Sequence, residues 1–242
     1  MPFKTFAEKL QLPETACLSV RAPTPLPFDL DGFHWGDDIL FDETTGEMDY
    51  DSGFTKSTQL LLEKLIHQCL MEKCGYRTRE VLLFGFGQGG MVALDVAARL
   101  EHGIQPSKAF EPSPQTGGSL KMGPTEHKPS NATGDTSDGF GSQEGLGGVI
   151  SVGGYVPHTI PPHKNGKYRS PILLCKAKSK SAVKEYHTNR LKDLFQDVQV
   201  VEWEKAGDSM PRSREEMMPI MEFFSRRLRS MRGVPEGSVE IT

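Results

Sequence analysis

Apolar residues along the chain fall into short runs rich in β-branched side chains, and these runs alternate with stretches of helical periodicity. The strand-like runs cover residues 16–21, 81–84, 148–152, 171–175 and 198–203. The helical patterns cover residues 61–70, 89–100, 182–195 and about 212–229. Such alternation is typical of a mostly parallel sheet with helices on both faces, so we expect an α/β fold.

The helix predicted at residues 61–70 has recognisable signals at both ends. Leucine, isoleucine and cysteine recur at helical spacing between Leu61 and Leu70, and Gly75 follows where a C-terminal cap belongs. Ser52 or Thr55 is the residue expected to cap the start of the helix. We expect an amphipathic helix that packs against the sheet.

One segment departs from this pattern. Of the 38 residues at 111–148, 22 are Gly, Ser, Thr or Pro. This composition buries too little apolar area to offset the entropy of ordering the chain, so we expect a flexible surface insertion in a single domain spanning residues 1–242. A neutral insertion and a regulatory or partner-binding segment both remain open.

Charge and composition exclude several classes of protein. The formal net charge is -4, which lacks the basic footprint of a nucleic-acid-binding protein. The longest apolar runs are shorter than the roughly 20 residues that a membrane helix needs, and the first residues do not resemble a secretory leader. Four cysteines without CxxC spacing are expected to be reduced thiols, so we expect a cytoplasmic protein.

The segment from Val81 to Leu94 reads as a strand, a glycine-rich turn and a helix in direct succession. In α/β hydrolases this context holds the nucleophile elbow G-x-S-x-G, in which a strained turn exposes a serine above the sheet. The turn here is Gly85-Phe86-Gly87-Gln88-Gly89, with Gly87 at the serine position. A dinucleotide fingerprint is a weaker reading, because no acidic residue ends a strand about 20 residues later.

With these residues the chain resembles the acyl-protein thioesterase, carboxylesterase and phospholipase family of α/β hydrolases, whose elbow commonly reads GFSQGG. Residues 17–27, 33–37, 148–154 and 215–224 are similar to further segments of that family. The family's early strand and its HGLGD-like loop have no counterpart, so the resemblance implies an α/β-hydrolase fold that lacks the first strand or strands. An upstream segment missing from the gene product is one explanation of this difference.

The same resemblance implies that the catalytic triad is degenerate. Lys180 stands at the aspartate position and Met210 at the histidine position, so the three triad positions are Gly87, Lys180 and Met210. None of the seven histidines lies after residue 187, where the chain order of the triad requires the base. Only the backbone N–H of Gln88 remains as an oxyanion donor.

Losing triad members costs on the order of a million-fold in turnover. We therefore expect a pseudoenzyme with a binding or regulatory role and no cofactor. The candidate ligand is an acyl or other small apolar molecule, and the protein partner is unknown. The alternative is an active carboxylic-ester or palmitoyl-protein thioester hydrolase that uses unidentified residues.

Several other residues have either a functional role or a purely structural one as their interpretation. His34 and Trp35 are candidates for the wall of a pocket at the carboxyl ends of the strands, although packing explains Trp35 equally well. Cys175 is expected to be core rather than a nucleophile. Histidine and aspartate pairs lack the further ligands of a metal site, and a lysine cluster reads as solvated surface. These last residues are His34, Asp37, Asp38, His158, His163, Lys176, Lys178 and Lys180.

Overall fold

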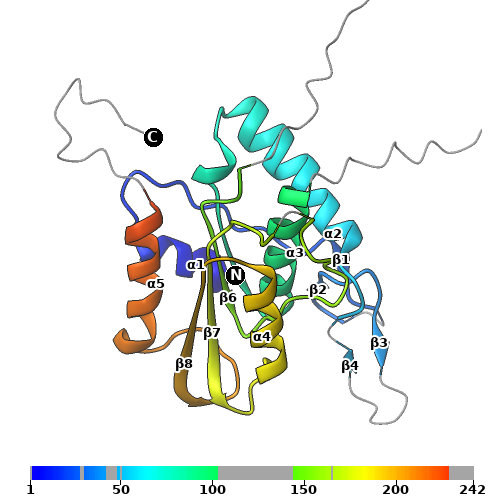
Figure 1. The fold of residues 1–242 in the computed structure, drawn as a ribbon, viewed down its shortest axis with the longest axis vertical. Helices are drawn as coiled ribbons and strands as arrows, with labels where there is room; N and C mark the ends of the chain where they lie inside the picture. Colours follow the sequence, from blue (N-terminus) through cyan, green and yellow to red (C-terminus); the bar gives the residue numbers. More distant parts are fainter. Residues whose placement is uncertain are drawn as a thin grey trace, which may run out of the picture.

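A computed structural model describes residues 2–27, 30–41, 48–49, 51–102, 144–164 and 166–228. The predicted flexible insertion at 111–148 lies mostly outside these residues. A four-stranded sheet forms the centre of the molecule, with helices on either side of it (Figure 1).

The sheet has the order β5-β6-β7-β8, and all three pairings are parallel. Its strands are β5 (Leu82–Phe86), β6 (Gly148–Val152), β7 (Ile172–Ser179) and β8 (Val198–Ala206). Each lies within a few residues of a predicted strand, which confirms the α/β fold and the parallel sheet. Among the described residues, β5 and β8 are the outer strands.

The helices are α1 (Pro2–Leu10), α2 (Thr55–Leu60), η1 (Leu61–Lys73), η2 (Thr78–Glu80), α3 (Gln88–His102), α4 (Glu185–Leu194) and α5 (Arg214–Arg227). Of these, α3 connects β5 to β6 and α4 connects β7 to β8. Two short antiparallel pairs lie between α1 and α2 in the chain, formed by β1 (Thr24–Pro25) with β2 (Phe33–His34), and by β3 (Leu40–Phe41) with β4 (Met48–Asp49).

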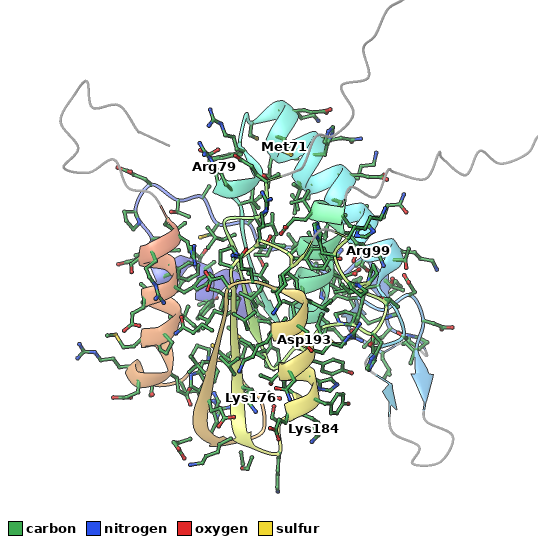
Figure 2. All side chains as sticks on the ribbon, in the orientation of Figure 1. Met71, Arg79, Arg99, Lys176, Lys184 and Asp193 are labelled. Carbon is green, nitrogen blue, oxygen red and sulfur yellow. The ribbon has the colours of Figure 1, made fainter. Side chains whose placement is uncertain are left out.

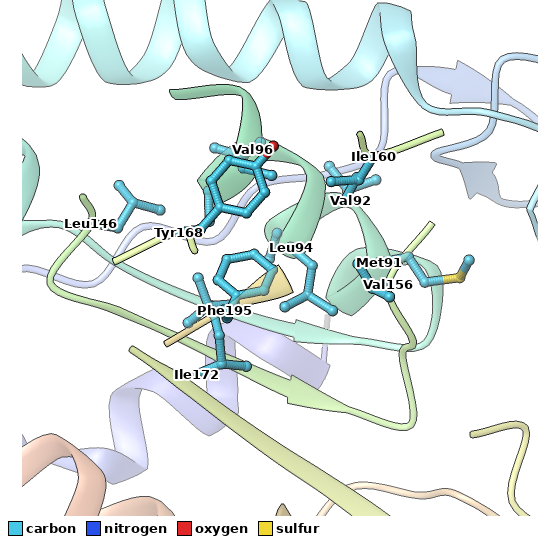
Figure 3. Packing of buried hydrophobic residues seen from close by; sticks show 14 of the residues in the cluster. Met91, Val92, Leu94, Val96, Leu146, Val156, Ile160, Tyr168, Ile172 and Phe195 are labelled. Carbon is cyan, nitrogen blue, oxygen red and sulfur yellow. The ribbon is translucent and has the colours of Figure 1, made fainter. Parts of the chain in front are cut away.

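The two faces of the sheet bury separate apolar clusters. Leu94, Tyr168, Ile172 and Phe195 belong to the first, which α3 covers (Figure 3). The second lies on the other face and includes Phe223 of α5. Phe6 of α1 packs on this second face, with its ring centroid 5.1 Å from that of Phe84. The central strand β6 is buried on both faces, as its continuous apolar sequence predicts.

The predicted strand at residues 16–21 is wrong. These residues form no strand in the structure, and Leu18 and Val20 are 61% and 46% exposed. Their apolar character matched a buried strand, but strand formation also needs a hydrogen-bonding neighbour, and the described part of the chain gives them none.

The helix predicted over residues 61–70 is confirmed as α2 continued by η1, which has π-helical geometry. Gly75 follows it with a positive φ of 75°, as expected for a C-terminal cap. The predicted N-terminal cap is wrong, because neither Ser52 nor Thr55 caps the helix through its side chain. The Asp37 carboxylate does so from a distant loop, accepting from the backbone N–H groups of Thr55 at 2.7 Å and Lys56 at 2.8 Å.

Candidate functional site

The turn between β5 and α3 has the shape of a nucleophile elbow. Gly87 has φ +53°, in the left-handed region. Its N–H donates to the Val152 carbonyl of β6 at 2.9 Å, and its own carbonyl accepts from Gly90 at 2.9 Å and Met91 at 3.1 Å. These bonds hold the turn at the carboxyl ends of β5 and β6.

Gly85 and Gly87 are favoured in the turn for different physical reasons. A Cβ at Gly85 would collide with the backbone of Gly89, so the close passage of strand and helix excludes any side chain there. A Cβ at Gly87 would meet no atom within 4 Å. The cost of a side chain at Gly87 therefore comes from its backbone conformation and not from crowding, and the space where an elbow serine would project is open.

The predicted residues Trp35 and Gln88 come together beside this turn. The backbone N–H of Trp35 donates to Oε1 of Gln88 at 3.3 Å, and the Trp35 carbonyl accepts from Oγ of Ser57 at 2.6 Å. The Trp35 indole nitrogen would lie 3.6 Å from a Cβ at Gly89. The loop that carries Trp35 therefore borders the elbow, although it is 53 residues away in sequence from Gln88.

The backbone of Gln88 remains the predicted oxyanion donor. Gln88 is the first residue of α3, where backbone N–H groups lack partners within the helix. The positive end of the helix dipole adds to the attraction that this position exerts on negative charge.

His34 is buried at 8% exposure, and its Nδ1 has no hydrogen-bond partner among the described residues. This nitrogen would lie 3.5 Å from a Cβ at Gly36, which places it beside the loop around Asp38 and Ser52. Within the described part of the chain, no hydrogen bond or ring contact joins the His34 ring to the elbow. Its role as a pocket wall therefore stays a prediction.

The carboxyl end of β6 packs against the other side of the turn. Ser151 of β6 is fully buried, and its Oγ donates to the Gly154 carbonyl at 2.7 Å. A Cβ at Gly154 would lie 2.5 Å from the Gly87 carbonyl oxygen. The end of β6 thus packs against the elbow. The Ser151 hydroxyl stabilises this end of the strand through its hydrogen bond to Gly154.

The other two triad positions lie in loops after β7 and β8. Lys180 is exposed and has φ +54°, a conformation that a lysine rarely adopts. Met210 is half-buried, and its carbonyl accepts from Nζ of Lys205 at 3.4 Å. Neither side chain offers a carboxylate or an imidazole for proton transfer.

Sequence reasoning missed Asp208, which lies in the same turn as Met210. Its carboxylate accepts from the N–H groups of Ala177 and Ala182, both at 2.8 Å, and from Oγ of Ser181 at 2.9 Å. A Cβ at Gly153 would lie 2.5 Å from the Cβ of Asp208. Asp208 therefore links the loop between β7 and α4 to the ends of β6 and β8. The sequence feature that could have identified Asp208 is its position two residues after β8.

His187 is a buried imidazole at the start of α4. Its Nδ1 accepts the backbone N–H of Lys184 at 3.1 Å, and its ring stacks on Tyr155 with centroids 3.9 Å apart. Burial, aided by the neighbouring His158, lowers the pKa of His187 to about 4. The ring is therefore neutral near pH 7 and serves as a helix cap.

Cys175 is a core residue, as predicted, whereas the prediction of solvated surface fails for Lys176, whose side chain is only 14% exposed. Cys175 is fully buried, and burial raises the pKa of its thiol to about 12, so it is not a thiolate nucleophile. Lys176 and Lys178 pair with glutamates on β8, Glu202 at 2.8 Å and Glu204 at 2.7 Å. Figure 2 shows Lys176 toward the lower end of the sheet.

Neither a metal centre nor a membrane helix emerges from the described residues. They contain no group of three or more His, Cys, Asp or Glu side chains arranged to hold a metal ion. None of their helices combines the length and apolar character that a bilayer span requires.

Comparisons with known proteins agree with this geometry. Residues 3–110 match the phospholipase/carboxylesterase family. An uncharacterized hydrolase of Schizosaccharomyces pombe is 26% identical over 247 residues, which span 99% of this chain and 83% of that protein.

Solved structures show the same architecture. A variant of Arabidopsis thaliana SOBER1 has a TM-score of 0.55 and 20% identity, with 94% of this chain and 91% of that chain covered. Zea mays acyl-protein thioesterase 2 has a TM-score of 0.53 and 17% identity, covering 93% and 88% of the two chains. The chain has the α/β-hydrolase fold, with a four-stranded parallel sheet in its described part.

Proposed function

We propose, from its resemblance to the phospholipases, carboxylesterases and acyl-protein thioesterases of the α/β-hydrolase fold, that this protein is a pseudoenzyme with a binding or regulatory role. The observation that carries the proposal is the elbow at Gly87. Its backbone has the strained left-handed conformation in which an elbow holds its serine, and the space above it is open, yet the residue has no side chain. The turn keeps the shape of a catalytic site without its nucleophile.

The surroundings of the elbow support the same conclusion. Lys180 and Met210 stand where the resemblance expects the acid and the base. The one histidine near the start of α4, His187, uses Nδ1 as an acceptor for a backbone N–H and has a pKa of about 4. Without a base to take up the proton, a water or hydroxyl near Gly87 is not activated for attack on an ester.

A small acyl or other apolar ligand is the occupant we propose for this site. The Trp35 indole lies beside Gly89 of the elbow, and the N–H of Gln88 at the start of α3 offers a donor to a carbonyl or carboxylate oxygen. Binding would then use the same contacts that esterases use for recognition. We place this function in the cytoplasm, as the cysteine content predicts.

The test of lost catalysis is an assay of the purified chain on short and long p-nitrophenyl esters and on an acyl thioester. We expect no turnover above that of the buffer. Gly87→Ser restores the hydroxyl but no base, so it should also be inactive, and it should destabilise the fold by about 1–3 kcal/mol because serine is strained at this φ. Gly87→Ala is the matched control, since it carries the same strain without a hydroxyl.

Turnover by the native chain at ordinary enzyme rates would overturn the proposal. Ligand binding is measured separately, by mass spectrometry of small molecules that co-purify with the native protein. An occupied site releases a defined acyl species on denaturation, and Gly87→Leu, which fills the open space, should reduce its amount.

The second candidate is an active ester or thioester hydrolase that uses other residues. Similarity to the hydrolase of Schizosaccharomyces pombe across nearly the whole chain favours it. Stoichiometric labelling of one serine or cysteine by a fluorophosphonate probe would support this candidate over the first.

A further inference from the structure

An acidic hollow lies on the opposite side of the sheet from the elbow's helix, between the outer strand β8 and the start of α5. Its volume is about 300 Å³. Its lining consists of Val201, Glu202, Trp203, Glu204, Ser213, Glu215 and Glu216. All four charged residues in this lining are glutamates, and we call this feature the β8 hollow.

The strand beside the β8 hollow has backbone groups that point away from the sheet. The N–H of Ile172 donates to the Asp197 carbonyl at 2.8 Å, which fixes the alternation of hydrogen bonds between β7 and β8. By this alternation, Val200 and Glu202 direct their N–H and C=O groups outward. Within the described part of the sheet no strand covers that edge.

Trp203 provides a buried donor in the lining. Its side chain is 4% exposed, and its indole Nε1 has no hydrogen-bond partner among the described residues. Nζ of Lys205 lies 4.1 Å from the centre of the indole ring and 3.1 Å from Oε2 of Glu216. An indole N–H left without an acceptor at this depth is costly unless something else accepts from it.

The charges of the β8 hollow select its occupant. Glu202 and Glu204 lie on one face of β8 and pair with Lys176 and Lys178 of β7, but their carboxylates remain 52% and 81% exposed. On the other face, Glu215 of α5 adds negative charge, whereas Glu216 is paired with Lys205. A second copy paired through the same edge would bring like charges together, which is unfavourable.

We propose that the outer edge of β8 and the β8 hollow bind an extended basic peptide segment of a partner protein as an added strand. The outward N–H and C=O groups of β8 pair with the peptide backbone, and lysine or arginine side chains contact the glutamates on both faces. A carbonyl or side-chain oxygen of the peptide accepts from Trp203. Strand addition of this kind combines backbone hydrogen bonds for affinity with side-chain contacts for specificity.

The test is calorimetric titration of the native chain, at 150 mM salt, with an octapeptide in which pairs of lysines alternate with pairs of valines, so that the extended peptide carries lysine on both faces. The matched peptides are one with glutamate in place of lysine and one methylated at alternate backbone nitrogens. We expect the basic peptide to bind at least tenfold more tightly than either, because charge complementarity and the backbone ladder are both required.

Variants of the protein localise the binding. Glu215→Gln should weaken it about two- to fivefold, and Trp203→Phe about three- to tenfold through loss of one donor. Glu222→Gln, on the same helix but outside the β8 hollow, is the matched control and should leave affinity unchanged. If Trp203→Phe unfolds, Glu202→Gln combined with Glu215→Gln tests the site at exposed positions only.

Three results would overturn the proposal. The first is the absence of measurable binding at millimolar peptide. The second is equal binding of the methylated peptide, which would indicate charge attraction without strand addition. The third is an equal loss of affinity in Glu215→Gln and Glu222→Gln, which would place binding elsewhere on the surface.

Discussion

At the scale of single residues, Gly87 has the backbone geometry of a catalytic turn but no nucleophilic side chain. Its positive φ and its bonds to β6 and α3 belong to the backbone and need no side chain. The sequence predicted this position from the surrounding strand, turn and helix. It did not find Asp208, because donors from β7 and from the loop after it converge on that carboxylate only in the folded chain.

His187 gives a prediction at the same scale. The unfolded chain protonates this residue near pH 6.5, whereas the folded chain does so only near pH 4. The unfolded state therefore binds more protons between these values, and the stability held above pH 6.5 falls as the pH drops toward 4. We expect a loss of about 1–2 kcal/mol in the free energy of unfolding.

Urea denaturation between pH 7 and pH 4 measures this loss. His187→Gln keeps a side-chain acceptor for the Lys184 N–H but does not titrate, so its stability should fall less over the same interval. An identical pH dependence in both proteins would show that other groups dominate.

At the scale of elements, the periodicity of apolar residues predicted the four strands of the sheet and the helices after them within a few residues. It failed at residues 16–21, where a strand needs a neighbour as well as an apolar sequence. It also failed at the start of α2, since a capping residue that comes from a remote loop leaves no local signal. Both failures concern partners that are distant in the chain.

The cap of α2 gives the prediction at this scale. Asp37→Ala removes the acceptor of two backbone N–H groups, so we expect a loss of about 0.5–2 kcal/mol in the free energy of unfolding. Asp38→Ala is the matched control, because among the described residues the Asp38 carboxylate accepts only from the adjacent N–H of Ile39, at 2.8 Å, and does not cap the helix. Chemical denaturation compares the two variants, and an equal loss would contradict the role of Asp37.

At the scale of the whole molecule, stability comes from apolar clusters on both faces of one sheet. The cluster under α3 is the larger, and it joins residues from α3, β6, β7 and the loops between them. A buried polar network adds to it, in which Asp95 accepts from Thr58 at 2.7 Å and pairs with Arg99 at 2.8 Å. Burial raises the pKa of Asp95 despite these partners.

Matched leucine variants test this distribution. Leu94 lies on the fully buried face of α3, so Leu94→Ala should cost about 2–5 kcal/mol through lost burial and a residual cavity. Leu60 is 45% exposed, so Leu60→Ala should cost less than about 1 kcal/mol. Thermal and urea unfolding measure both, and similar losses would show that α3 does not anchor the core.

The sequence by itself determined the α/β class, the parallel strands and the turn that holds Gly87, because local periodicity and glycine positions encode them directly. It also determined that no serine stands at the elbow. Only the tertiary structure decided which groups meet there: Trp35 beside Gln88, Asp208 across three segments, and the glutamates around Trp203. Such contacts join residues far apart in the chain, and their energies depend on distances and burial that no local pattern carries.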